Sequence, residues 1–179
     1  MEQFSYDALE SENYQKIAEA VGDANPILDV GCGEGELANF LGTTLGKHVQ
    51  GIDVSSTKLV RAREAAKAKG ISHVVQFVEG DAKHLDFLAD GAFGAIVSVY
   101  TLHELDDPQE VLKELRRVLR ARGKLVVVDF VKRGKAEELW RERYYTPQEI
   151  ESMLQQAGII KVNIEYVHED VVFVSSVKI

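Results

Sequence analysis

The stretch Ile27-Leu28-Asp29-Val30-Gly31-Cys32-Gly33-Glu34-Gly35 decides the fold of this 179-residue chain. Its apolar residues are typical of a buried strand, and the glycines at alternate positions predict a tight turn that brings a ligand close to the backbone. A helical apolar pattern follows directly at 36–45. A strand, a glycine loop and a helix in this order predict one unit of an α/β sheet with a ligand site at the loop.

The pattern continues outward from this stretch along the chain. Strand-like and helix-like segments alternate over the first 130 residues, which predicts a mainly parallel sheet with helices on both faces. A capping-box sequence at 146–149 predicts a late helix ending near Gly158. The expected strands are 26–31, 48–54, 74–78, 93–99 and 124–130, with a closing antiparallel hairpin of 160–168 and 171–177; the other expected helices are 36–45, 56–69 and 109–119, with a helical turn at 85–88. No linker or repeat interrupts the pattern, so residues 1–179 are expected to form one α/β domain.

The glycine loop has its own chemical character. Glu36 stands where a dinucleotide-binding Gly-x-G-x-x-Gly loop would have its last glycine, and a Gly-Lys-Ser/Thr sequence is absent from the chain. Asp29 and Glu34 bring negative charge to the loop, which repels a pyrophosphate and attracts a cation. The loop therefore favours a ligand with positive charge.

Two further carboxylates follow the next two expected strands. Asp53 can accept hydrogen bonds from both hydroxyls of a ribose, and Val54 beside it can pack on an adenine face. Asp81 can accept from an exocyclic amine, while the Ala82 amide can donate to a ring nitrogen. Because the carboxyl ends of parallel strands meet at one edge, these groups and the glycine loop predict an adenosine site.

Composition narrows the classes of protein and partner. The net charge is −8, from 29 acidic and 21 basic side chains, which argues against a broad nucleic-acid-binding surface. The basic cluster at 116–122 is interpreted as the solvated face and last turn of a helix. Cys32 is the single cysteine, so an internal disulfide framework and a cysteine metal cluster are excluded and no metal is expected. No apolar run is long enough for a membrane span, and no signal peptide is evident, so a cytoplasmic protein is expected.

These motifs together resemble the class I S-adenosylmethionine-dependent methyltransferases. Residues 27–35 resemble the first motif of that family, 51–55 the second and 80–82 the third, and the likeness continues through 93–130 and 145–158. The resemblance implies a seven-stranded Rossmann-like sheet whose last strand is inserted antiparallel, with S-adenosylmethionine as methyl donor. It implies that residues 1–25, with the aromatic residues Phe4, Tyr6 and Tyr14, form a helical cap over the donor. The residues implied or expected to bind the donor are Asp29, Gly31, Cys32, Gly33, Asp53, Val54, Asp81, Ala82 and Ser98.

Candidate catalytic residues follow the fourth expected strand. Methyl transfer needs mainly alignment of the acceptor, and a general base only where the acceptor loses a proton. His103 can serve as that base because it titrates near neutrality, and Tyr100 lies in the same segment; Glu104 could orient His103 or hold an acceptor. A local structural role for His103, such as capping a helix, is the alternative.

The same segment bears on the acceptor. It lacks the Asn-Pro-Pro-Tyr sequence of many nucleic-acid methyltransferases and is similar to small-molecule and quinone-pathway methyltransferases, so a small-molecule acceptor is expected. Tyr144 and Tyr145 could line its pocket or belong to the core. The segment between the strand expected at 124–130 and the late helix is short. The site is therefore expected to be open, or to be completed by a second copy of the chain in a homodimer. Two alternatives for the function stay open: a non-catalytic S-adenosylmethionine-binding partner protein, and an NAD(P)-dependent oxidoreductase.

Overall fold

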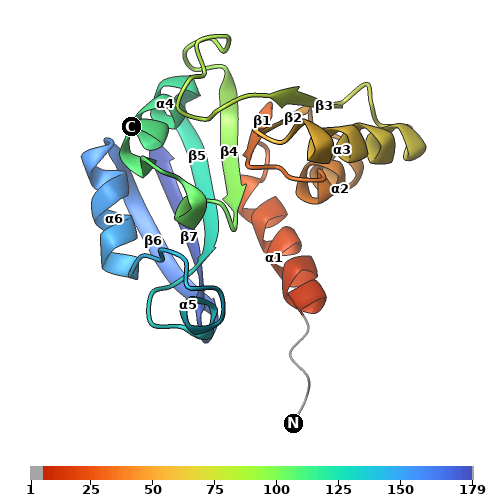
Figure 1. Ribbon diagram of the computed structural model, residues 1–179. Coiled ribbons are helices and arrows are strands. Elements are labelled where there is room, and N and C mark those ends of the chain that lie inside the picture. Colours follow the sequence, from red (N-terminus) through yellow and green to blue (C-terminus); the bar gives the residue numbers. More distant parts are fainter. Residues whose placement is uncertain (1–5, 179) are drawn as a thin grey trace.

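A computed structural model describes the backbone of residues 6–178 and the side chains of residues 12–178. Phe4 and the side chain of Tyr6 lie outside these ranges. The described residues form a single sheet of seven strands, in the spatial order β3-β2-β1-β4-β5-β7-β6 (Figure 1). The strands are β1 Ile27–Val30, β2 Val49–Asp53, β3 Val75–Glu79, β4 Phe93–Val99, β5 Leu119–Phe130, β6 Ile159–His168 and β7 Val171–Lys178.

The first five strands run parallel, and the last two form an antiparallel hairpin. β1 pairs in parallel with both β2 and β4, while β7 lies antiparallel between β5 and β6. The chain order therefore reverses between β1 and β4, which is the place where open α/β sheets bind ligands. This topology confirms the expected Rossmann-like sheet with its inserted antiparallel strand.

Helices cover both faces of the sheet. α1 Tyr6–Val21, α2 Glu36–Leu45 and α3 Ser56–Ala68 lie on one side in Figure 1, and α4 Pro108–Val118 and α6 Pro147–Gln156 lie on the other. A 3-10 turn, η1 Leu102–Glu104, and the short helix α5 Lys135–Trp140 complete the elements. None of the helices in the described part of the chain is long and apolar enough to cross a membrane.

The two faces hold separate apolar cores, because the side chains of a strand alternate between them. Val97 and Val126 pack with the α1, α2 and α3 face, whereas Ile96 and Val127 pack with α4 and α6. Because helices cover both faces, all of β1 and all of β4 except Val99 are buried, and both strands are mainly apolar.

Local sequence signals set most helix boundaries. The Ser55 side chain accepts from the Lys58 amide at the start of α3. The Asp107 side chain likewise accepts from the Glu110 amide at the start of α4, whose first residue is Pro108. In α6 the capping box is complete, since Thr146 and Glu149 each bond the backbone amide of the other. These three helices confirm the boundaries expected from their caps.

The expectation for residues 116–124 was wrong in one respect. Arg116 and Arg117 do end α4, but β5 begins at Leu119, five residues earlier than expected, so the rest of the basic cluster is extended. Leu119 is fully buried and pairs with Phe93, which pulls the chain into the sheet at once. Residues 120–123 then form an irregularity opposite Gly94 before pairing resumes at Lys124.

The helical turn expected at 85–88 is an isolated turn. The Leu88 amide donates to the Leu85 carbonyl at 2.7 Å, but no helix continues from it in the structure described. Arg117 supplies the reason, because its guanidinium bonds the carbonyl oxygens of Leu85 and Leu88 and holds the segment as a loop.

Candidate functional site

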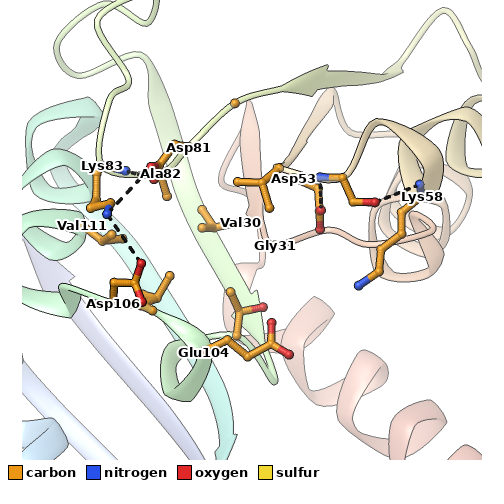
Figure 2. Close-up of a pocket in the computed structure, with 15 residues that line it drawn as sticks. Val30, Gly31, Asp53, Lys58, Asp81, Ala82, Lys83, Glu104, Asp106 and Val111 are labelled. Atoms are coloured by element: carbon orange, nitrogen blue, oxygen red, sulfur yellow. Dashed lines mark hydrogen bonds and ion pairs between the residues drawn. The ribbon is translucent and has the colours of Figure 1, made fainter.

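A cavity lies at the carboxyl ends of β1, β2, β3 and β4, across the reversal of strand order. Its volume is about 280 Å³, and Figure 2 shows side chains entering it from the ends of several strands. Loops beyond β1, β2 and β3 and the segment after β4 supply the wall. The lining residues are Val30, Gly31, Asp53, Val54, Ser55, Lys58, Gly80, Asp81, Ala82, Lys83, Thr101, Glu104, Leu105, Asp106 and Val111.

Gly31 must be glycine for two reasons. Its φ of +70° lies in the left-handed region, and a Cβ there would stand 2.3 Å from Oγ1 of Thr101. The segment after β4 thus packs directly on the glycine loop. The close contact shapes the point where the loop, β1 and β4 meet.

Asp53 ties the loop to the end of β2. Its Oδ2 accepts from the Gly33 amide at 2.9 Å, and its Oδ1 accepts from the Ser55 amide at 2.8 Å. Each carboxylate oxygen keeps lone-pair capacity toward the cavity, since a carboxylate offers about four acceptor sites. Val54, next in the chain, is 71% exposed on the cavity wall, a high value for an apolar side chain and one that suits a ligand face.

Asp81 enters the cavity from the loop after β3, across from Asp53 (Figure 2). One of its oxygens accepts from the Lys83 amide, and the Lys83 ammonium lies 3.9 Å from the other and 4.0 Å from Asp106. Ala82 is buried in the same wall. The cavity therefore carries carboxylates at two ends, as the sequence predicts for Asp53 and Asp81.

A smaller cavity of about 110 Å³ adjoins the loop on the α1 side. Gly31 lines both cavities, so the two meet at the loop. The residues of the smaller one are Tyr14, Asp29, Gly31, Cys32, Gly33, Glu36, Leu37, Val99 and Tyr100. Ligand pockets commonly occupy roughly 300–1,000 Å³, and the combined volume of the two cavities falls within this range.

Asp29 is the unusual group of this smaller cavity. It is 2% exposed, and its Oδ2 has no hydrogen-bond partner within the described residues. Burial raises the pKa of Asp29 to about 7, with a smaller rise from the charge of Asp53, against the opposing effect of a backbone hydrogen bond from Ala38. A buried carboxylate with an unused oxygen is a place where a cation would be stabilised.

Cys32 is inert in this setting. Its thiol is buried, and burial, followed by the charges of Asp29 and Asp53, raises the pKa well above the usual range. A thiol that stays protonated is a poor nucleophile. Cys32 therefore contributes its backbone and its volume to the cavity.

Tyr100 links the smaller cavity to an aromatic group behind it. It has a φ of +51°, which is uncommon for a bulky residue and is held by a hydrogen bond from its amide to the Val128 carbonyl. Its hydroxyl accepts from the Asn13 amide group, and its ring stacks on Phe130 with centroids 4.7 Å apart. The strained backbone thus places the ring between α1 and β5.

His103 lies one ring layer further on and is tightly bonded. Its Nδ1 is 2.6 Å from Oδ1 of Asp129, and its backbone amide donates to Oδ2 of the same carboxylate at 3.1 Å. Burial lowers the pKa of His103, but the Asp129 hydrogen bond and charge, with the charges of Glu104 and Glu142, outweigh it and raise the pKa above its ordinary value. Asp129 is a site residue that the sequence analysis missed.

Glu142 and Tyr144 close the other side of His103. The Nε2 atom of His103 is 3.3 Å from Oε2 of Glu142, and the Tyr144 hydroxyl donates to that same oxygen at 3.0 Å. Tyr144 is buried against the His103 ring, whereas Tyr145 packs with the core on the opposite sheet face. Of the two tyrosines expected near an acceptor, only Tyr144 lies beside His103.

Ser98 is placed differently from the other expected residues. It is buried in β4 between Val30 of β1 and Val127 of β5. Neither Ser98 nor His103 is among the described residues that line the two cavities. The remaining expected residues line one or both of them.

Comparison with known proteins assigns the family. Residues 28–127, more than half of the chain, match the family described as methyltransferase domain. Methyltransferase GfsG of Streptomyces halstedii is 34% identical over 126 residues, which cover 70% of this chain and 44% of that protein. Demethylmenaquinone methyltransferase of Thermus thermophilus is 40% identical over 105 residues, covering 58% of this chain and 46% of that protein.

The chain thus spans about half the length of these curated relatives. A solved structure of a SAM-dependent methyltransferase from Aquifex aeolicus has the same fold, with a TM-score of 0.79, 23% identity, and coverage of 99% of this chain and 100% of that one. The family match, the glycine loop and the two carboxylates agree with one another. This chain belongs to the class I S-adenosylmethionine-dependent methyltransferase family.

Proposed function

We propose that this chain binds S-adenosylmethionine in the two adjoining cavities and transfers its methyl group to a small-molecule acceptor. The observation that carries the proposal is the placement of Asp53, which fixes the glycine loop through Gly33 and still faces the larger cavity. A carboxylate at this point accepts from ribose hydroxyls in many Rossmann-like sites.

The larger cavity fits the adenosine part of the donor. Asp53 would hold the ribose, and the exposed face of Val54 would pack on the adenine ring. Asp81 and Ala82 lie together on the opposite wall, where a carboxylate oxygen and a backbone amide match the edge of an adenine base. The charges and shapes of these four residues support the binding of an adenosine group, rather than a pyrophosphate, in the larger cavity.

The smaller cavity fits the cationic methionine part. The unpartnered Oδ2 of Asp29 would gain a favourable charge interaction from the donor's ammonium. No atom of the described residues lies within 4 Å of the position that a Cβ of Gly33 would take, so these residues leave room for a ligand close to the loop backbone. Tyr14 of α1 lines this cavity, and α1 would serve as part of the helical cap formed by residues 1–25.

The donor, when bound, supplies an activated methyl group, so the chain's task is to place the acceptor and exclude water. Tyr100 is positioned for this because it borders the smaller cavity. His103, one ring away through Phe130, would act as the general base for an acceptor that must lose a proton. Ser98 would act indirectly, from its buried position in β4, by fixing the shape of the carboxyl end of that strand.

A small molecule is the acceptor that the chain favours. A protein with net charge −8 attracts a nucleic-acid backbone poorly. One relative is named for demethylmenaquinone, a small molecule, which supports the same class here.

We further propose that residues 1–179 act as one domain, in the cytoplasm, with a second copy of the chain completing the open side of the site. A buried, reduced Cys32 suits a reducing compartment. Light scattering of the purified chain tests the homodimer, and a monomeric mass at micromolar concentration contradicts it.

Thermal unfolding with different ligands tests the proposed function. S-adenosylmethionine and S-adenosylhomocysteine should raise the midpoint, because a ligand that binds only the folded state stabilises it. NAD and NADP should leave the midpoint unchanged. A shift with the nicotinamide cofactors alone would contradict the proposal.

A further inference from the structure

Two large apolar side chains lie exposed beside each other on α5. Leu139 is 67% exposed, and Trp140, the last residue of the helix, is 46% exposed. The other large apolar side chains that are exposed among the described residues stand apart from one another in the sequence: Val54, Val60, Phe87, Ile160 and Tyr166. Single exposed apolar residues are normal on a protein surface, whereas a leucine and a tryptophan together form an apolar patch. This pair is therefore a candidate for a contact surface.

Trp140 is the outer end of a row of aromatic rings that begins at the smaller cavity. Tyr100 lines that cavity, and its ring stacks on Phe130 with centroids 4.7 Å apart. Phe130 in turn meets Trp140 edge-on, with centroids 5.3 Å apart. Because α5 follows the carboxyl end of β5, the row lies at the edge of the sheet where the cavities open (Figure 1). The apolar pair is thus connected to the smaller cavity by packed rings.

The segment around this pair is basic, although the chain as a whole is acidic. Residues 132–143 contain five basic and three acidic side chains, while the whole chain has a net charge of −8. All five basic residues are exposed: Lys132, Arg133, Lys135, Arg141 and Arg143. The apolar pair therefore lies within a local region of positive charge.

Two of the three acidic residues in this segment are engaged with other groups of the protein. A carboxylate oxygen of Glu137 accepts from the Arg133 backbone amide, and one of Glu142 accepts from the Tyr144 hydroxyl. Glu138 is exposed. The negative charge that the segment presents to solvent is therefore smaller than its composition suggests.

Two arginines beside α5 carry charge that no acidic residue offsets directly. Lys132 and Lys135 form ion pairs with acidic residues of α6 and of the turn between β6 and β7. Arg133 and Arg141 form no ion pair within the part of the chain whose side chains are described, and they lie on either side of α5. Their φ angles of +69° and +58° are uncommon for such residues and are held by the surrounding structure. Both arginines are thus available to an anionic partner.

This combination of side chains is typical of proteins that bind at the surface of a membrane. Tryptophan prefers the level of the lipid headgroups, leucine enters the apolar boundary below it, and basic side chains attract anionic headgroups. A stable contact with another protein needs a larger surface, since such interfaces bury about 1,200 Å² or more. Two apolar side chains on a helix of six residues favour the lipid surface.

We propose that α5, with Arg133 before it and Arg141 after it, docks this chain on an anionic lipid surface. Leu139 and Trp140 enter the headgroup region, and the two arginines contact the anionic headgroups. The docking sets the row of aromatic rings, with the smaller cavity at its inner end, against the lipid. This inference goes beyond the proposed function, because it concerns a surface that the chain binds and not the reaction.

Tryptophan fluorescence tests the docking directly, because Trp140 is the single tryptophan of the chain. Vesicles of phosphatidylcholine mixed with phosphatidylglycerol should shift its emission to shorter wavelength, whereas vesicles of phosphatidylcholine alone should not. High salt should reverse the shift, since it screens exposed charges. No shift with the anionic vesicles, or an equal shift with both kinds, would overturn the proposal. A shift that follows protein concentration without vesicles would place a second copy on this surface instead.

A pair of charge reversals locates the docking surface. Arg141→Glu should weaken co-sedimentation with the anionic vesicles by roughly 5- to 30-fold, since each basic residue near such a surface contributes about a factor of five. Arg122→Glu is the matched control, because Arg122 is also exposed and has a similar φ of +60° but lies near the start of β5, at the opposite end of that strand. This control should bind the vesicles as the native chain does. Equal binding by the two variants would contradict the proposal.

A second variant tests the apolar contribution. Leu139→Ser changes an exposed side chain, so it should weaken vesicle binding without lowering the midpoint of thermal unfolding. Native affinity of Leu139→Ser for the anionic vesicles would remove the apolar pair from the docking surface and overturn the proposal. None of these measurements uses a methyl donor or acceptor, so failure of the docking is distinguishable from failure of the proposed function.

Discussion

The Gly33 amide donates to Oδ2 of Asp53 across 2.9 Å, joining the glycine loop after β1 to the end of β2. One carboxylate thus has two roles, because it holds the loop in shape and faces the larger cavity. Loop geometry and ligand affinity are therefore coupled through Asp53. Substitutions in either the loop or the carboxylate should change binding of S-adenosylmethionine.

Replacing Asp53 should weaken donor binding strongly. Asp53→Ala removes the proposed ribose acceptor and leaves two amides without their partner, so we expect a loss of about 1–3 kcal/mol, or roughly 5–150-fold in the dissociation constant. Asp86→Ala removes an exposed carboxylate beyond the cavity and serves as the matched control. Equal affinities of the two variants in calorimetry would remove Asp53 from the site.

Gly31→Ala should destabilise the fold as well as the site. The new methyl group would meet Thr101 at 2.3 Å, and the φ of +70° is unfavourable for alanine. Gly46→Ala is the matched control, because its φ of +61° is similar but no atom in the described part of the chain lies within 4 Å of the added Cβ. We expect Gly31→Ala to lower the free energy of unfolding by about 1–3 kcal/mol more than Gly46→Ala, measured in urea; equal losses would show that the contact with Thr101 is easily relieved.

The buried carboxyl of Asp29 should make the ligand-free protein less stable at high pH. Its pKa is raised from 3.8 to about 7, so its contribution is fully present below pH 3.8 and is lost as the pH rises through 7. The loss amounts to roughly 4 kcal/mol at most. Asp29→Asn should abolish this part of the pH dependence between pH 4.5 and 8.5 in urea unfolding, while the exposed-site control Asp23→Asn should retain it.

Donor binding should release a proton near pH 7. A cation beside Oδ2 of Asp29 favours the ionised carboxyl, so binding lowers the pKa of Asp29 and its proton leaves. The binding enthalpy measured in phosphate and in Tris should then differ, and Asp29→Asn should remove the difference. A buffer-independent enthalpy for the native chain would place the cation away from Asp29.

The sequence alone predicts the sheet and the meeting of Asp53 and Asp81 at its edge, because both rest on local signals. The alternating apolar runs set the strands, Thr146 and Glu149 set the start of α6, and the positions of Asp53 and Asp81 at strand ends bring them to one cavity. The start of β5 is the exception. Residues 119–122 combine an apolar residue with arginines in a pattern that suits a helix end equally well, and only pairing of Leu119 with Phe93 decides it.

The surroundings of His103 could not be predicted in the same way. Asp129 lies 26 residues further along the chain and meets His103 only because β4 and β5 are neighbours. The one available signal was the acidic residue Asp129 at the end of an apolar run, just before Phe130, because a buried carboxylate requires a partner. Glu142 lies in an irregular segment with no periodicity, so its position depends on tertiary contacts alone.

Calorimetric titration of S-adenosylmethionine into the intact chain tests the central claim most directly. The account predicts saturable binding at one site per chain, weakened by Asp53→Ala and unaffected by Asp86→Ala. Absence of binding by the folded native protein, or binding that Asp53→Ala leaves unchanged, would contradict it.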